Sequence, residues 1–168
     1  MTRFVARQLR RIGSALCVLA MLAPGDVRAQ AAGDPGAACA TLGDIISAAP
    51  RQFRDVASDE YVTLFESWRA RITVAGFDAC WIDDVTRAFW CIHRANGVAE
   101  AGRVAARQAE RLDQCWPAVA THQTVETGDD GVTRLIQDWS VAEGRRIRLV
   151  HRKPSRGEGL SAVFLYVY

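Results

Sequence analysis

The chain has 168 residues, of which 21 are Lys or Arg and 19 are Asp or Glu, so its formal net charge at pH 7 is +2. Five of the basic residues but only one acidic residue, Asp26, lie within residues 1–29, which leaves 16 basic and 18 acidic groups downstream. This balance lacks the basic excess typical of nucleic-acid-binding domains. We therefore expect no nucleic-acid partner.

Residues 1–29 have the three parts of a secretory signal peptide. Four arginines precede an apolar run from Ile12 to Ala23, and small side chains precede Gln30. The run is shorter than the roughly 20 apolar residues that a membrane-spanning helix needs. We expect cleavage after Ala29, a periplasmic or extracellular location, and no transmembrane segment in the mature chain.

Cleavage after Ala29 leaves 139 residues, close to the common size of one domain. Residues 30–38 are small, rich in glycine and contain Pro35, which predicts a flexible leader. The remaining residues, 39–168, are expected to form a single domain.

One helix, one strand and one hairpin are predicted in the first half of this domain. Leu42, Ile45, Ile46 and Ala49 recur at helical spacing before Pro50. Residues 67–74 alternate between polar and apolar side chains, which predicts a half-buried strand. The segment from Cys80 to His93 is palindrome-like around a polar centre and predicts a hairpin.

Four cysteines remain in the mature chain, and in an oxidising compartment they predict two disulfides with three arithmetically allowed connectivities. The predicted hairpin places Cys80 opposite Cys91 and Trp81 opposite Trp90, and cross-strand neighbours are close enough for a disulfide. Spacing therefore favours Cys80–Cys91, with Cys39 paired to Cys115.

The second half repeats the order of helix and then strands. An amphipathic helix is predicted from Val98 to Trp116, where Pro117 ends it. A polar link follows, and then three strand-like runs over residues 132–141, 145–152 and 160–168. The predicted fold class is α+β, with the element order α-βββ-α-βββ, two helices packed on one face of an antiparallel sheet, and disulfide staples.

No catalytic or cofactor motif is evident. His93 and His151 fall on predicted strands and His122 falls in the polar link, without a serine elbow or an orienting group beside them. The chain has no Cys-x-x-Cys motif and no histidine pair at metal-ligand spacing. We therefore expect no catalytic residues, no metal and no cofactor.

A candidate binding surface emerges when strand parity is applied to the last three strands. Arg146, Arg148 and Arg152 share one side of their strand, and Arg134 faces outward on the strand before it. Phe164, Tyr166 and Tyr168 form an aromatic stripe on the final strand. Arginine and tyrosine are enriched at interface hot spots. The candidate partner-binding residues are Arg134, Arg146, Arg148, Arg152, Tyr166 and Tyr168.

The function most consistent with these patterns is non-enzymatic binding or inhibition of a macromolecule, such as an acidic protein or a glycan, by an exported domain. The alternatives are a small envelope enzyme of hydrolase type without a recognisable motif, and an outer-membrane-associated β protein, since the aromatic stripe resembles the closing strand of such proteins. A solvated sheet face without a binding role is the other interpretation of the arginines. No motif identifies a known family.

Overall fold

The computed structural model describes residues 35–119, 121–154 and 160–168. The expected signal peptide, its cleavage site and residues 30–34 of the expected leader lie outside these residues. Helix α1 (Pro35–Ala48) begins inside the segment expected to be a flexible leader. Residues 35–38, which were expected to belong to the leader, are therefore helical.

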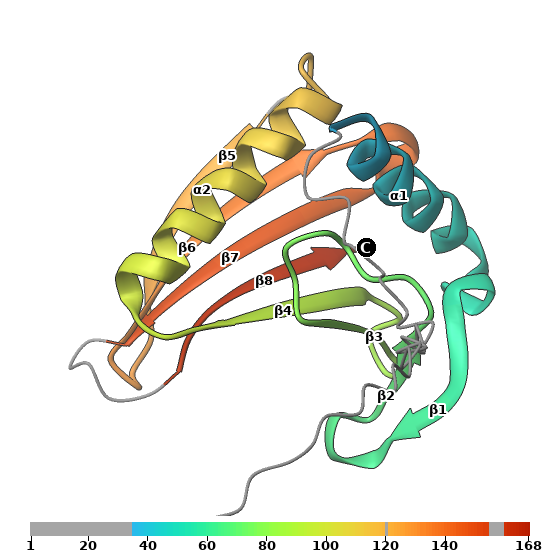
Figure 1. Cartoon of the computed structure of the whole chain (residues 1–168), viewed down its shortest axis with the longest axis horizontal. Helices are drawn as coiled ribbons and strands as arrows, with labels where there is room; N and C mark the ends of the chain where they lie inside the picture. Colours follow the sequence, from blue (N-terminus) through green and yellow to red (C-terminus); the bar gives the residue numbers. More distant parts are fainter. Residues whose placement is uncertain (1–34, 120, 155–159) are drawn as a thin grey trace, which may run out of the picture.

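The described elements form two successive units, each a helix followed by four strands (Figure 1). The first unit consists of α1, the 3-10 turns η1 (Ala49–Arg51) and η2 (Arg54–Val56), β1 (Ala57–Val62), the turn η3 (Thr63–Phe65), β2 (Ser67–Ala70), β3 (Ala79–Asp83) and β4 (Phe89–Ala95). The second unit consists of α2 (Val98–Cys115), β5 (Thr121–Thr127), β6 (Val132–Ser140), the turn η4 (Ala142–Gly144), β7 (Arg146–Pro154) and β8 (Ser161–Val167).

All strands join one antiparallel sheet of eight strands in the order β1-β2-β3-β4-β8-β7-β6-β5. The predicted order of three strands after each helix is therefore wrong, because β1 and β5 were not expected. These two strands form the edges of the sheet. His122, expected in a link, lies on β5, and the strand expected over residues 67–74 ends at Ala70.

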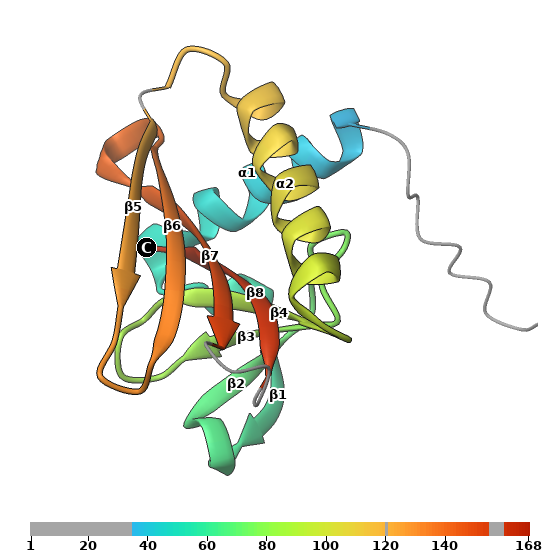
Figure 2. The ribbon, with the colours of Figure 1, turned by 90° about the vertical axis from the view of Figure 1, so that its left-hand side faces the viewer.

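The packing of the helices confirms the α+β class but modifies the expected arrangement. α2 packs across β4, β8 and β7, whereas α1 contacts mainly α2 and the turns η1 and η2. Figure 2 shows both helices on the same side of strands β5 to β8, with α1 behind α2. Neither helix within the described residues is long and apolar enough to cross a membrane.

The core lies between the helices and the sheet face that they cover, which we call the helix face. Val163, Leu165 and Val167 alternate along β8 with 1 % exposure or less, as expected for one side of a strand. Their cross-strand neighbours include Phe89 and Cys91 of β4, which are also fully buried. The large buried apolar surface of these central strands anchors the sheet to α2.

Two disulfides close the fold with the pairing favoured by the cysteine spacing. Cys80 and Cys91 are bonded and lie opposite each other on β3 and β4, and Trp81 lies opposite Trp90 in the same register. Cys39 of α1 is bonded to Cys115, the last residue of α2. The second bond therefore fixes α1 to the helix on which it packs.

Candidate functional site

The strand register places all six predicted binding residues on the sheet face opposite the helices. Arg148 of β7 lies opposite Tyr166 of β8, and Arg152 lies opposite Arg134 of β6. Residues two apart along a strand point to the same side, so the remaining members share this side. We call it the aromatic–arginine face; its members are Arg134, Arg146, Arg148, Arg152, Phe164, Tyr166 and Tyr168.

The aromatic members of this face form a stacked column along β8. The ring centroids of Phe164 and Tyr166 are 6.1 Å apart with planes inclined by 17°, and those of Tyr166 and Tyr168 are 6.1 Å apart at 14°. Trp90 lies opposite Tyr166 on the neighbouring strand and stacks on Trp81 at 4.5 Å. The column is thus continuous with an aromatic surface extending to β3.

Burial keeps the two tyrosines in their neutral form. It raises the pKa of both Tyr166 and Tyr168; Tyr168 raises the pKa of Tyr166 further, whereas Arg148 and Arg146 lower the pKa of Tyr168. Their hydroxyl groups therefore remain able to donate and to accept hydrogen bonds at neutral pH.

The arginines of the face differ in how strongly they are paired within the chain. Arg148 donates two hydrogen bonds to Asp138, at 2.8 and 2.9 Å, and these bonds raise the pKa of Arg148. Arg134 donates to Asp130 at 2.9 Å, and the guanidinium of Arg146 lies 5.2 Å from the centroid of the Tyr168 ring. The expected field of guanidinium groups is therefore partly neutralised by its own neighbours.

Arg152 is the exception. Its Nε is buried and has no hydrogen-bond partner among the described residues. Its direct cross-strand neighbours are Arg134 on β6 and Ala162 on β8. A guanidinium donor thus lies beside a second guanidinium without a carboxylate directly opposite it.

A groove of about 490 Å³ lies along the aromatic–arginine face over β6, β7 and β8. Its lining includes an apolar cross-strand row, in which Ile136, Val150 and Phe164 are direct neighbours. The rows on either side carry arginines and one carboxylate each: one contains Arg134 and Arg152, with Glu126 opposite Arg134, and the other contains Arg148 between Asp138 and Tyr166. We call this hollow the β6–β8 groove.

The aromatic column also borders a second hollow, of about 340 Å³, on its other side. Asp83, Ala88 and Trp90 line this hollow together with the three aromatic residues of β8. The column therefore forms a ridge between two hollows, so that each hollow is bounded by the same rings. Sequence reasoning missed the lining contributed by Trp90 and Ile136, because it did not predict that β4 pairs with β8 or how β6 aligns with β7.

The chain matches no protein-family model, no curated protein and no solved structure. Arguments about its function therefore rest on its own residues. Over residues 35–119, 121–154 and 160–168, the structure shows no group of three His, Cys, Asp or Glu side chains arranged to hold a metal ion.

Proposed function

We propose that this chain is an exported, non-enzymatic binding module that holds an extended acidic peptide segment of another protein on its aromatic–arginine face. Export is supported by the signal-peptide pattern of residues 1–29 and by the two disulfides. Disulfides of this kind persist in oxidising compartments. The proposed location is the periplasm or the extracellular space.

The observation that carries the binding proposal is the order of the three cross-strand rows in the β6–β8 groove. An apolar row lies between two rows that carry guanidinium groups. An extended peptide directs successive side chains to opposite sides. Apolar side chains of such a peptide can contact Val150 and Phe164, while flanking carboxylates reach the arginines on either side.

The acidic character of the partner follows from the pairing of the arginines. Arg134 and Arg152 are direct cross-strand neighbours, and like charges in that position destabilise a sheet. Arg134 is bonded to Asp130, but the buried Nε of Arg152 has no partner among the described residues. A carboxylate supplied by a bound peptide would satisfy this donor and reduce the repulsion between the two arginines.

The aromatic column supplies the second part of the binding energy. Aromatic and arginine side chains are enriched at interface hot spots. Aromatic side chains combine a large contact area with few rotatable bonds, and arginine combines it with bidentate hydrogen bonding. The three parallel rings of β8 restrain one another, so little rotamer entropy is lost when a partner contacts them.

Selection from a library of displayed random peptides tests this function, with the oxidised protein as the target. The Arg152→Glu variant serves as the counter-target, and Arg107→Glu on the exposed side of α2 is the matched control. We expect enriched sequences in which Asp or Glu lies beside apolar residues. Such peptides should bind the Arg107→Glu variant as well as the native protein and should lose at least about tenfold in affinity for Arg152→Glu, since a charge-assisted hydrogen bond contributes roughly 1.5–3 kcal/mol.

Two outcomes contradict the proposal. Selection without enrichment, or enriched peptides that bind all three proteins equally, would show that the groove does not bind peptides. The same face would be assigned to a glycan partner instead if three results held together: no peptide is enriched, the native protein binds immobilised acidic polysaccharide, and Arg152→Glu does not.

A further inference from the structure

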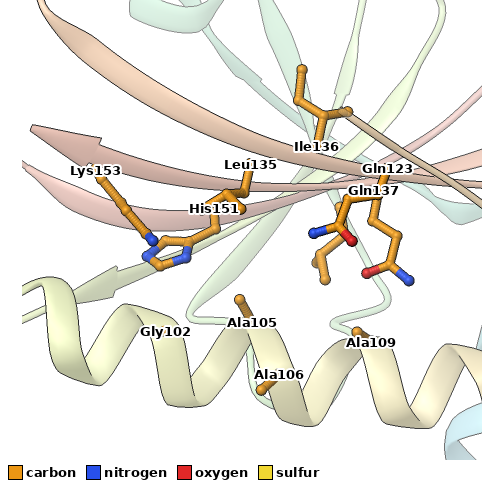
Figure 3. A pocket seen from close by; sticks show the side chains of 11 residues that line it. Gly102, Ala105, Ala106, Ala109, Gln123, Leu135, Ile136, Gln137, His151 and Lys153 are labelled. Carbon is orange, nitrogen blue, oxygen red and sulfur yellow. The ribbon is translucent and has the colours of Figure 1, made fainter. Parts of the chain in front are cut away.

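A second hollow lies on the opposite side of the sheet, between α2 and the outer strands β5, β6 and β7 (Figure 3). Its volume is about 310 Å³, at the lower end of the range for small-molecule sites. We call it the helix cavity. It lies on the opposite side of the sheet from the β6–β8 groove, because its other strand residues belong to the helix face; Ile136 of β6 borders both hollows.

The cavity exists because α2 presents only small residues to these strands. Its helical wall consists of Gly102, Ala105, Ala106 and Ala109, which follow a spacing of three and four residues. Such positions lie on one side of a helix. Larger side chains there would fill the space, as Val104 and Leu112 do where α2 contacts the core.

His151 of β7 lines this cavity, and one of its two ring nitrogens is buried without a hydrogen-bond partner among the described residues. The residue is only 7 % exposed, and its Nε2 is buried without a partner among the described residues. The ring reaches the helix, since a Cβ built on Gly102 would lie 3.6 Å from the imidazole Cε1. A buried polar atom without a partner destabilises the folded protein, so a ligand atom that bonds this nitrogen would recover stability.

The other polar groups define what such a ligand must carry. Gln123 and Gln137 are direct cross-strand neighbours, and Figure 3 shows their amides extending toward α2. Figure 3 also shows the Lys153 side chain extending toward the His151 ring. Among the described residues that line the cavity, Lys153 is the one that is charged, whereas Leu135 and Leu149 contribute apolar surface. The cavity thus has a cationic end, an apolar wall and an amide end.

We propose that the helix cavity binds a small organic carboxylate. The carboxylate lies at the end formed by Lys153 and His151, where the ammonium supplies the charge and the imidazole supplies a hydrogen bond. The short apolar body of the ligand lies against Leu135 and Ala105. A simple inorganic anion would leave this apolar wall and much of the volume unfilled, so the organic part contributes to the affinity.

Nuclear magnetic resonance of the oxidised protein tests the assignment, with hexanoate as the probe. The chain has three histidines, His93, His122 and His151. The imidazole signal that is missing from the spectrum of the His151→Gln variant is that of His151. We expect a saturable shift of the His151 signal alone. Hexanamide, which has the same body without the charge, should bind at least about tenfold more weakly, because the pairing of Lys153 with a carboxylate is lost.

Two variants separate binding in the cavity from binding elsewhere. Ala105→Leu fills the space and should abolish the shift, whereas Arg107→Leu adds the same side chain to the exposed side of α2 and should leave the shift intact. If Ala105→Leu does not fold, Lys153→Gln gives an independent result, since it should remove the preference for hexanoate over hexanamide.

The proposal is overturned if hexanoate produces no saturable shift of the His151 signal. It is also overturned if Ala105→Leu folds and hexanoate shifts its His151 signal as much as that of Arg107→Leu. The third contradicting result is that Lys153→Gln still prefers hexanoate over hexanamide. Binding of inorganic phosphate with no response to hexanoate would show an anion site that does not recognise the organic part of a ligand.

Discussion

Arg152 shows at the scale of one residue why the aromatic–arginine face is better suited to binding than to stability. It lies opposite Arg134, and its buried Nε has no partner among the described residues. Arg148, by contrast, is held by two hydrogen bonds to Asp138, and the side chains of this pair are only 29 % and 13 % exposed. Arg152 can therefore be replaced with little structural cost, whereas replacement of Arg148 would leave a buried carboxylate unpaired.

Replacement of Arg152 by glutamate is expected to preserve or increase stability. The Arg152→Glu variant converts a like-charge cross-strand pair into an opposite-charge pair, which is worth roughly 0.2–1 kcal/mol. It also removes the attraction between Arg152 and Asp130, but this carboxylate is exposed and the interaction is screened by solvent. Urea unfolding of the native protein and the variant measures this difference. A fall of more than about 1 kcal/mol in the free energy of unfolding would show that Arg152 has a structural role that the described contacts do not reveal.

His151 is expected to make the fold sensitive to acid. Burial, with a smaller contribution from Lys153, lowers the pKa of His151 below its ordinary value of 6.5. Below that value the unfolded chain takes up a proton that the folded chain does not accept, so the free energy of unfolding falls as the pH falls toward the lowered pKa.

The His151→Gln variant removes this effect and should lose less stability than the native protein between about pH 7.5 and about pH 5.5. Urea unfolding at both pH values measures the two losses, and the groups common to both proteins cancel in the comparison. Equal losses would show that the imidazole titrates in the folded protein as it does in the unfolded chain.

At the scale of elements, the sequence predicts those strands whose side chains alternate or mirror one another. The β3–β4 hairpin follows from the facing pairs Cys80–Cys91 and Trp81–Trp90, because a register that joins the cysteines also joins the tryptophans. The last three strands follow from apolar alternation over residues 132–141, 145–152 and 160–168, which differs from β6, β7 and β8 by one or two residues at their ends. Both helices are also predicted, although α1 begins earlier than expected.

The two strands that were missed, β1 and β5, are the edges of the sheet. β1 is polar at Ser58–Glu60 and has an irregular register with β2, and most of β5 is exposed. Edge strands pair on one side only and commonly carry polar or charged side chains that discourage association. The alternation that identifies half-buried strands is therefore weak in both of them.

The candidate site was predictable only as far as strand parity allows. Parity places Arg146, Arg148 and Arg152 on one side of β7, and the structure places Tyr166 and Tyr168 on that same side of the sheet. Hydrogen-bond partners such as Asp138 depend on the register between β6 and β7, which parity does not determine. The helix cavity depends on how α2 lies over the outer strands, and the short-range pattern of the sequence does not specify that placement.

At the scale of the whole molecule, the order of the strands is symmetric about the β4–β8 pair. Each half consists of a helix followed by four strands, and corresponding strands occupy mirrored positions from the centre to the edges. The disulfides do not follow this symmetry, since one lies within the first sheet half and the other joins the two helices. The Cys39–Cys115 bond is therefore a covalent link between the halves in addition to the main chain from β4 to α2.

Removal of the two disulfides is expected to have unequal effects. The bonds close segments with sequence separations of 76 and 11 residues. In the chain-entropy model the longer closure contributes about 4–5 kcal/mol and the shorter about 3 kcal/mol. Urea unfolding should therefore show a greater loss for Cys39→Ala/Cys115→Ala than for Cys80→Ala/Cys91→Ala. A greater loss for the second pair would indicate that local geometry at β3 and β4, rather than chain entropy, dominates.

The affinity of an enriched acidic peptide for the native protein and for Arg152→Glu, measured by isothermal titration calorimetry, tests the central claim most directly. The claim is that the aromatic–arginine face is a binding surface. It predicts that the variant binds at least about tenfold more weakly while Arg107→Glu binds like the native protein, because Arg152 lines the groove whereas Arg107 lies on α2. Equal affinities for all three proteins would contradict it.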